Sequence, residues 1–510
     1  MFNETNSVAI EGINGKIIKT EADVSDGLPG FSMVGYLSSE VREARERVWI
    51  SLKNAGFKIP PKKITINLSP ADIRKDGTSY DLSIAVAVLA AIGILSDKYL
   101  KDSVIIGELS LDGRVKPVTG ILSMVYTAYD KGFKYVIVPE GNKNEAMVVN
   151  GINIIPISEI ADLPVILLYP DEYVIKNQSP VISFEDNSPI PDFSDVRGQS
   201  ISKRAIETAV SGMHNILMIG PPGSGKSMLA KRIPGIMPIP DFDEKMEISK
   251  IYSVSGLLSD ENPIIKRRPF RSPHHTVTQT ALVGGGRYPK PGEITLANGG
   301  VLFLDEFPEF ARQTIEVLRQ PMEDGVINVS RVGGSYRYPA RFQLVAAMNP
   351  CPCGFFPDRR KCTCPDRVVK RYLSKISQPI LDRIDICTET TSLEYSEINI
   401  NNTNKNETTE EIRKRVIKTH KIQSERYKDE EFKFNAHLTP NKIKKYCKLS
   451  PDAEDLIKNV FESDTISSRA YHRILRVSRT LADMEEADII DEKHVAEAIS
   501  YRNNDKNLWR

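Results

Sequence analysis

Between a short apolar run and the start of a helical pattern, the chain reads Gly220-Pro221-Pro222-Gly223-Ser224-Gly225-Lys226-Ser227. This stretch fits the phosphate-loop pattern G-x-x-x-x-G-K-[ST] at every fixed position. Its glycines let backbone N–H groups turn toward phosphates, and a helix N-terminus favours negative charge. We expect Lys226 to reach the β- and γ-phosphates of ATP and Ser227 to hold Mg²⁺. The apolar run 215–219 predicts the buried strand that must precede such a loop.

Length and composition limit the number of domains and the classes of protein that this chain can belong to. A chain of 510 residues predicts two to four domains. The net charge is +1, so any basic surface for nucleic acid must be local. The start of the chain shows no signal peptide, and the longest apolar run, 84–95, is too short to span a bilayer. We expect a soluble cytoplasmic protein without a membrane partner, whose six cysteines form no disulfide framework.

Four regions follow one another along the chain. Residues 1–170 alternate between expected strands (64–68, 104–106, 135–138) and expected helices (38–55, 83–94) and predict an α/β domain. Residues 171–190 are polar with scattered prolines and predict a linker. Residues 191–395 carry the nucleotide motifs, and helical patterning dominates 396–510.

Two further apolar runs end in polar side chains. Residues 301–304 precede Asp305 and Glu306, which predicts a buried parallel strand opening into a site. Asp305 would bind Mg²⁺ and Glu306 would polarise the attacking water as general base. Residues 342–348 precede Asn349, whose amide can hydrogen-bond the γ-phosphate or that water. The alternatives are solvated acids at a strand end and an asparagine cap.

The order of these motifs resembles that of AAA+ ATPases, and more narrowly the magnesium-chelatase subunit I type and its ComM/YifB group. Segments 270–275, 282–287, 291–297, 299–306 and 381–385 carry the resemblance, which covers essentially the whole chain. It implies an α/β fold with an N-terminal Lon-peptidase-like domain (1–170), a central AAA+ parallel-sheet P-loop domain (191–395) and a C-terminal helical lid (396–510). It also implies ATP and Mg²⁺ as cofactors, and a homo-oligomeric ring, expected to be a hexamer, with ATP between neighbours.

The resemblance assigns roles to single residues. Asn349 matches the sensor 1 position, and Arg383 is similar to the arginine finger that reaches a neighbour's ATP. Arg469 resembles the sensor 2 arginine of the lid, with Arg473 as the alternative one turn later. For each arginine, the residues alone favour a surface salt bridge.

Segment 325–338 predicts a hairpin, because β-branched residues alternate on one arm and Gly-Gly stands near the turn. In the AAA+ branch that this chain resembles, such a hairpin enters the central channel. Arginine and tyrosine suit a nucleic-acid strand, while ordinary cross-strand pairing is the alternative. The expected DNA contacts are Arg331, Tyr336, Arg337 and Tyr338, with a second candidate at Arg287 in the cationic loop 284–290.

Two clusters could bind metal. The cysteines form a C-x-C…C-x-C pattern that can hold a structural Zn²⁺, although the spacing is unusual and reduced, exposed thiols are the alternative; they are Cys351, Cys353, Cys362 and Cys364. Adjacent His274 and His275 should point in opposite directions on an extended segment. We therefore expect packing or polar contacts from them rather than a metal pair.

The N-terminal domain resembles Lon peptidases through segments 76–85 and 111–120. Ser79 falls where that family has its serine, but Leu122 occupies the place of the lysine base. We therefore expect a structural or DNA-guiding role. For the whole chain we expect an ATP-driven DNA motor, and the resemblance points to branch migration in recombination or natural transformation. A chelatase-like ATPase that remodels a protein partner is the alternative, and an ATP-dependent peptidase is a third.

Overall fold

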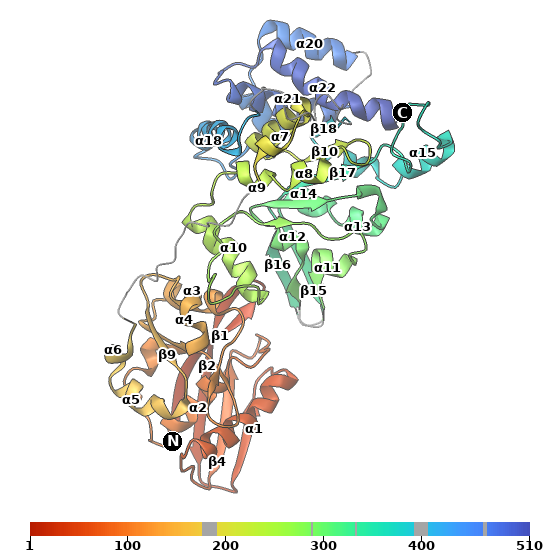
Figure 1. Cartoon of the computed structure of the whole chain (residues 1–510). Coiled ribbons are helices and arrows are strands. Elements are labelled where there is room, and N and C mark those ends of the chain that lie inside the picture. The colour runs from red at the N-terminus through yellow and green to blue at the C-terminus, as the bar shows by residue number, and fades with distance from the viewer. Residues whose placement is uncertain (176–190, 287–288, 332–333, 392–405, 463–466, 510) are drawn as a thin grey trace.

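The structure is a computed structural model and describes residues 1–175, 191–286, 289–331, 334–391, 406–462 and 467–509. Three parts follow one another along the long axis: an N-terminal domain, a central domain around the phosphate loop, and a group of C-terminal helices (Figure 1). The mixed α/β architecture with a parallel central sheet confirms the predicted fold class.

The N-terminal domain is built on a seven-stranded sheet in the order β3-β4-β2-β1-β5-β8-β9. The expected strands and helices are present, with ends shifted by up to three residues. The elements of the sheet and its cover are β1 (Phe2–Glu11), β2 (Asn14–Ser25), β3 (Gly30–Val34), α1 (Ser39–Asn54), β4 (Lys63–Ser69), α2 (Asp81–Ala91), β5 (Ser103–Ile105), α3 (Ile121–Asp130), β8 (Tyr135–Pro139), α4 (Lys143–Ala146), β9 (Asn153–Ile157), α5 (Leu163–Leu168) and α6 (Pro170–Tyr173), with a small β6 (Glu108–Leu109) and β7 (Val115–Lys116) ribbon.

The two central strands, β1 and β2, are polar in sequence and were not predicted. They pair antiparallel from Phe2↔Asp23 to Glu11↔Asn14. Helix α2 pairs two of their buried hydroxyls, because Thr5 donates to the Ser83 carbonyl at 3.1 Å and Thr20 lies 3.1 Å from the Ser83 hydroxyl. A polar strand can therefore occupy the middle of this sheet without leaving these groups unpaired.

The central domain is built on a five-stranded parallel sheet in the order β11-β14-β17-β10-β18. Because the strands are parallel, the segments that follow them meet at one edge of the sheet. The elements are α7 (Ser200–Gly212), β10 (Ile216–Ile219), α8 (Lys226–Ala230), α9 (Ile233–Ile236), α10 (Phe242–Val254), β11 (Phe270–Arg271), α11 (Gln279–Val283), β12 (Gly284–Gly285), β13 (Lys290–Pro291), α12 (Glu293–Leu296), β14 (Val301–Leu304), α13 (Arg312–Glu316), α14 (Arg319–Asp324), β15 (Val326–Arg331), β16 (Gly334–Pro339), β17 (Gln343–Met348), α15 (Asp366–Leu373), α16 (Gln378–Leu381) and β18 (Ile386–Glu389).

The C-terminal part is helical and shares one apolar core with α7 and the sheet. A buried charge network also holds it together: Arg426 donates to Asp483 at 2.6 and 2.7 Å, and Arg479 donates to the same carboxylate at 3.0 Å. The helices are α18 (Thr409–Arg426), α19 (Pro440–Tyr446), α20 (Pro451–Glu462), α21 (Ser468–Met484) and α22 (Glu492–Trp509).

Helix α10 joins the N-terminal and central domains. On the N-terminal side, Lys250 Nζ lies 3.2 Å from the ring centre of Tyr126, and the Gly120 N–H donates to the Ser253 carbonyl at 3.1 Å. On the other side, the Tyr252 hydroxyl donates to the Leu296 carbonyl at 3.1 Å, just before β14. Of the predicted linker, 171–173 complete α6, and 176–190 lie outside the described residues.

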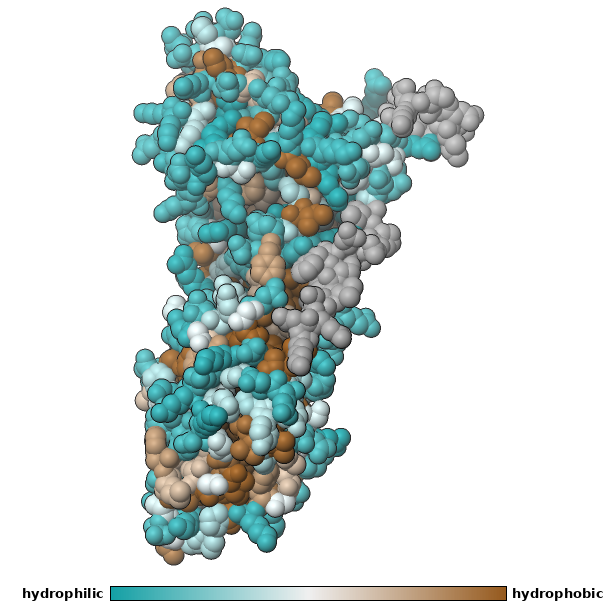
Figure 2. Space-filling view, turned by 90° about the vertical axis from the view of Figure 1, so that its left-hand side faces the viewer, coloured by the Kyte–Doolittle hydropathy of each residue, from teal (hydrophilic) through white to brown (hydrophobic). Residues whose placement is uncertain are grey.

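The surface is mixed in character. Hydrophilic side chains cover most of the face in Figure 2, and apolar ones gather mainly on its lower half, which the N-terminal domain forms. Within the described ranges, no helix combines the length and the apolar character needed to cross a bilayer.

Candidate ATP site

The phosphate loop runs from β10 to α8, as its pattern requires. Gly223 and Gly225 have φ of +76° and +88°, a left-handed conformation that glycine adopts without strain. At Gly220 a Cβ would lie 2.1 Å from the Thr390 hydroxyl, so a larger residue would collide with the end of β18. The loop sequence is therefore fixed by local backbone geometry as well as by its ligand.

Lys226 is buried and faces back across the loop. Its Nζ donates to the carbonyls of Gly220 and Pro221 at 2.7 and 2.9 Å and to Asn349 Oδ1 at 3.3 Å. Burial lowers the pKa of Lys226 to about 8, and the nearby negative charge of Asp305 raises it by a smaller amount. The ammonium group thus lies in a poorly hydrated position where an incoming phosphate would interact with it strongly.

Ser227 and Asp305 come together from different elements. Ser227 lies at the start of α8, and Asp305 directly follows β14. The Ser227 hydroxyl donates to Asp305 Oδ2 at 2.5 Å. The other oxygen of Asp305 accepts the N–H of Glu306 at 2.9 Å. A hydroxyl and a carboxylate at this spacing form the donor set that Mg²⁺ takes beside nucleotide phosphates. The residues present therefore fit a magnesium ion.

Glu306 has a partner that sequence reasoning missed. Its φ is +51°, and its exposed carboxylate lies 3.2 Å from His275 Nδ1. The strand pairing explains the contact, because β11 runs parallel to β14 with Phe270 opposite Val301. The segments that follow these neighbouring strands therefore lie side by side. The contact between His275 and Glu306 could have been predicted only if residues 270–271 had been recognised as a strand.

The expectation that His274 and His275 point in opposite directions was wrong. Their ring centres lie 4.1 Å apart with an interplanar angle of 34°. The chain turns there, with the Val277 N–H donating to the His274 carbonyl at 2.9 Å, so the alternation of an extended strand does not apply. His275 also makes an edge contact with Phe310, in line with the predicted packing and polar roles.

Arg383 lies at the opposite edge of the sheet. Its carbonyl accepts from Asn215 Nδ2 at 2.9 Å, and Asn215 directly precedes β10. The phosphate loop follows the far end of the same strand, a separation of about 13 Å for four residues. The Arg383 guanidinium contacts Glu323 and donates to the Pro379 carbonyl at 2.6 Å. It therefore does not join Lys226 within one chain.

Both lid arginines also lie on the Arg383 side. Arg473 is buried and donates to the carbonyls of Leu381 and Ile384 at 2.9 and 3.1 Å. Arg469 is 71% exposed and lies 3.7 Å from Asp382, which Arg473 also contacts at 3.2 Å. Arg473 thus holds α21 against the end of α16, whereas Arg469 projects into solvent. The sequence did not predict that Asp382 would be the shared partner of Arg469 and Arg473.

The hairpin forms as β15 and β16, but not all of its predicted DNA contacts are exposed. Tyr338 is fully buried and donates to the Pro289 carbonyl at 2.8 Å, and Tyr336 is half-buried, whereas Arg337 is exposed. Side chains alternate along a strand, so both tyrosines share the inner face with Val329 and Ile327. The prediction that Tyr338 contacts DNA is therefore wrong, because its side chain is buried. Arg331 ends β15, and Arg287 lies outside the described residues.

The hairpin also touches the N-terminal domain. Ile13, in the β1–β2 turn, packs in the same apolar cluster as Ile327 and Tyr338. At Gly12, a Cβ would lie 3.5 Å from the Arg337 carbonyl. The N-terminal domain thus supports the inner face of the hairpin and leaves the Arg337 face open.

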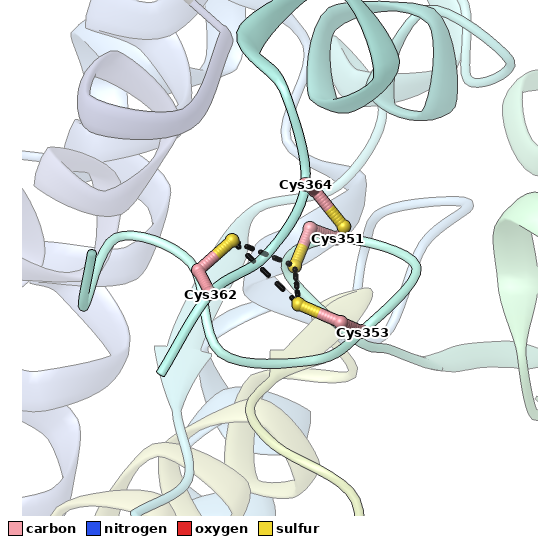
Figure 3. A group of neighbouring side chains, drawn as sticks. All are labelled: Cys351, Cys353, Cys362 and Cys364. Atoms are coloured by element: carbon pink, nitrogen blue, oxygen red, sulfur yellow. Dashed lines mark hydrogen bonds between the residues drawn. The ribbon is translucent and has the colours of Figure 1, made fainter. Parts of the chain in front are cut away.

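The four predicted metal ligands come together directly after Asn349. Their sulfur atoms all lie within 4.8 Å of one another, and those of Cys351, Cys353 and Cys362 are 3.3 to 3.8 Å apart (Figure 3). Tetrahedral Zn–S bonds of about 2.3 Å place sulfurs roughly 3.8 Å apart, so the cluster fits zinc. The Phe356 N–H points to the Cys351 sulfur at 3.4 Å, a contact that stabilises a thiolate.

This cysteine loop also abuts the phosphate loop. Gly354 has a φ of +85°, and a Cβ there would lie 2.3 Å from Pro222 Cδ. The loop is thus connected to the site twice: through the chain to Asn349 and through space to Pro222.

The peptidase-like site is incomplete. Leu122, in the place of the family's lysine, is fully buried, and its N–H donates to Glu145 at 3.1 Å. Lys116, which is near that place in the sequence but out of register with it, lies on β7 and is exposed, and Ser79 is buried. A leucine cannot activate a serine hydroxyl, so the fold is present without the expected base.

Comparison with known proteins gives matches along nearly the whole chain. The family model described as magnesium chelatase, subunit ChlI, matches residues 192–398; that of subunit ChlI of Mg-chelatase matches 20–142; and the subunit ChlI C-terminal model matches 406–502. Competence protein ComM of Haemophilus influenzae is 40% identical over 500 residues, covering 97% of this chain and 96% of that protein. Protein YifB of Escherichia coli is 40% identical over 499 residues, covering 98% and 96%. A Lon protease of Trichlorobacter lovleyi is 26% identical over 170 residues, 31% of this chain and 21% of that protein.

Proposed function

The chain belongs to the magnesium chelatase subunit ChlI family, in the group that includes ComM and YifB, and on this premise we propose that it is a ring-forming ATPase that moves DNA. The family supports ATP hydrolysis, and the observation that carries it here is the meeting of four side chains from three strand ends: Lys226, Ser227, Asp305 and Asn349. A magnesium ion held by Ser227 and Asp305 would neutralise phosphate charge.

Each residue then has a distinct part in the reaction. Lys226 binds the β- and γ-phosphates, and Asn349, hydrogen-bonded to it, orients the γ-phosphate or the water. Glu306 accepts the proton of the attacking water as general base, and His275 orients that carboxylate. Arg383, too far from its own loop, would stabilise the transferred phosphoryl group in the neighbouring subunit.

A DNA substrate is supported by two observations. One relative is a competence protein by name, and Arg337 stands exposed on a hairpin whose inner face rests on the N-terminal domain. We propose that Arg337 and Arg331 contact the phosphate backbone, with Arg287 as a further contact, and that Tyr336 stacks on a base only if the hairpin leaves Ile13. We propose a homo-oligomeric ring, expected to be a hexamer, because the proposed ATP site would be completed by a neighbouring subunit.

ATPase rates with single-stranded, duplex, forked and four-way DNA test the substrate. Stimulation by branched DNA, lost in Arg337→Ala but kept in the exposed control Arg367→Ala, supports the proposal. Stimulation by a partner protein and by no DNA would favour the chelatase-like alternative. The basal rate of Arg337→Ala should equal that of the unaltered chain, because Arg337 lies on the hairpin and not in the ATP site.

We further propose that Cys351, Cys353, Cys362 and Cys364 hold a structural Zn²⁺. Metal analysis of the purified chain should give one zinc per chain, and Cys351→Ser should release it. Cys387→Ser is the matched control, because this buried cysteine lies on β18 outside the cluster. Equal zinc content in all three proteins, or none in any, would contradict the site.

A further inference from the structure

One acidic residue connects the hairpin to the arginine that faces the neighbouring subunit. Glu323 lies on α14, three residues before β15 begins, and its carboxylate contacts the Arg383 guanidinium. The base of the hairpin is closed just beyond it, where the Ala340 N–H donates to the Gly325 carbonyl at 2.8 Å. A displacement of the hairpin is thus transmitted to Glu323 through a very short piece of chain.

Few polar contacts hold Arg383 on its own subunit. Its side chain is 14% exposed, whereas that of Glu323 is 59% exposed. Besides Glu323, the guanidinium donates to the Pro379 carbonyl, and its Nε has no hydrogen-bond partner among the described residues. An ion pair with one exposed partner is weak, because water competes for the carboxylate. A triphosphate carries more negative charge and accepts two parallel hydrogen bonds, so it would bind the guanidinium once Glu323 has moved away.

We infer that Glu323 is a positioning residue that holds Arg383 against its own subunit and releases it when the hairpin moves. The inference rests on the proposed function, since it requires Arg383 to act on a neighbour's ATP. Movement of the hairpin by its substrate would draw Glu323 away from Arg383 and free the finger for the adjoining site. Hydrolysis would then be rapid only where the hairpin is engaged, which is the coupling that a motor needs.

Glu323→Gln tests this inference, because it removes the charge and keeps the size of the side chain. We expect the ATPase kcat without DNA to rise about three- to tenfold, with KM for ATP little changed, since Glu323 does not touch the Lys226 side of the site. Stimulation by forked DNA should fall toward onefold. The melting temperature should stay the same, because Glu323 is an exposed residue.

Glu316→Gln is the matched control. Glu316 lies on the preceding helix, α13, and pairs with Arg319 at 3.4 Å without contacting Arg383. It should leave both kcat and the stimulation unchanged. An unchanged or lower kcat in Glu323→Gln, or the same rise in Glu316→Gln, would overturn the inference.

Arg383→Ala separates this inference from the proposed function. If Arg383→Ala abolishes hydrolysis while Glu323→Gln behaves as the unaltered chain, the arginine-finger role of Arg383 is supported and the role of Glu323 is refuted. If Arg383→Ala hydrolyses ATP normally, the arginine-finger role is refuted, and so is the proposed release of Arg383 by Glu323.

Discussion

The two edges of the five-stranded sheet carry different chemistry. At the carboxyl-terminal edge, two hydrogen-bonded pairs lie side by side: Lys226 with Asn349, and Ser227 with Asp305. At the amino-terminal edge, Arg383, Arg469 and Arg473 are held by acids and carbonyls of their own chain. The first edge has the residues that fit a magnesium nucleotide, whereas the arginines of the second edge contact their own chain, with only Arg469 largely exposed. The difference teaches that the residues of the proposed nucleotide site and the proposed finger arginine, Arg383, do not meet within one chain.

The largest effect should come from the binding edge. Glu306→Gln removes the proposed base but keeps the size of the side chain, so ATP should bind normally while its hydrolysis slows about 10²–10⁴-fold. Single-turnover hydrolysis and nucleotide binding on the same protein measure the two effects. Glu309→Gln, three residues further on, is the control and should hydrolyse ATP normally. A normal rate in Glu306→Gln would remove this residue from the reaction.

Lys226→Ala tests whether the binding edge depends on its buried ammonium group. Loss of its charge-assisted hydrogen bonds to phosphate costs about 3 kcal/mol, so affinity for ATP should fall about 100-fold. Titration with a fluorescent ATP analogue measures it. Lys231→Ala, at the exposed residue directly after the same helix, should bind ATP as before. Unchanged affinity in Lys226→Ala would refute the assignment of the loop.

The pH dependence of ATP binding also tests the role of the buried Lys226 charge. Burial lowers the pKa of Lys226 to about 8, and bound phosphates would raise it. Below pH 8 the lysine is charged with or without ATP, so affinity should not vary. Above pH 8 binding must take up a proton, and affinity should fall about tenfold per pH unit. Calorimetric titrations from pH 7 to 9.5 measure this, and Lys226→Arg, which does not titrate in that range, should show a flat profile.

Mixing two inactive variants tests whether the two edges meet between subunits. Lys226→Ala and Arg383→Ala should each be inactive alone. In a 1:1 mixture, about one interface in four joins an intact loop to an intact finger, so ATPase activity should return to roughly a quarter of normal. Rates are measured after the variants exchange subunits, with each variant alone as the control. A mixture that remains inactive would mean that both edges act within one chain.

Much of this arrangement could be predicted because it depends on neighbours in sequence. The phosphate loop, the strand before Asp305 and Glu306, and the strand before Asn349 are local patterns of apolar runs and glycines. The hairpin was predicted as well, but the predicted DNA contact Tyr338 is buried, because its alternation with Arg337 places it on the inner face. The polar strands β1 and β2 escaped prediction because the buried hydroxyls of Thr5 and Thr20 find their partner in Ser83, far along the chain.

The sequence by itself determined the chemistry of the binding edge, because parallel strands bring the residues after them to one place whatever else the chain does. Only the tertiary structure decided which residues face one another: His275 with Glu306, Glu323 with Arg383, and Asp382 with the lid arginines. Those contacts join segments whose distance in space depends on strand order and helix packing. No periodicity or local motif contains that information.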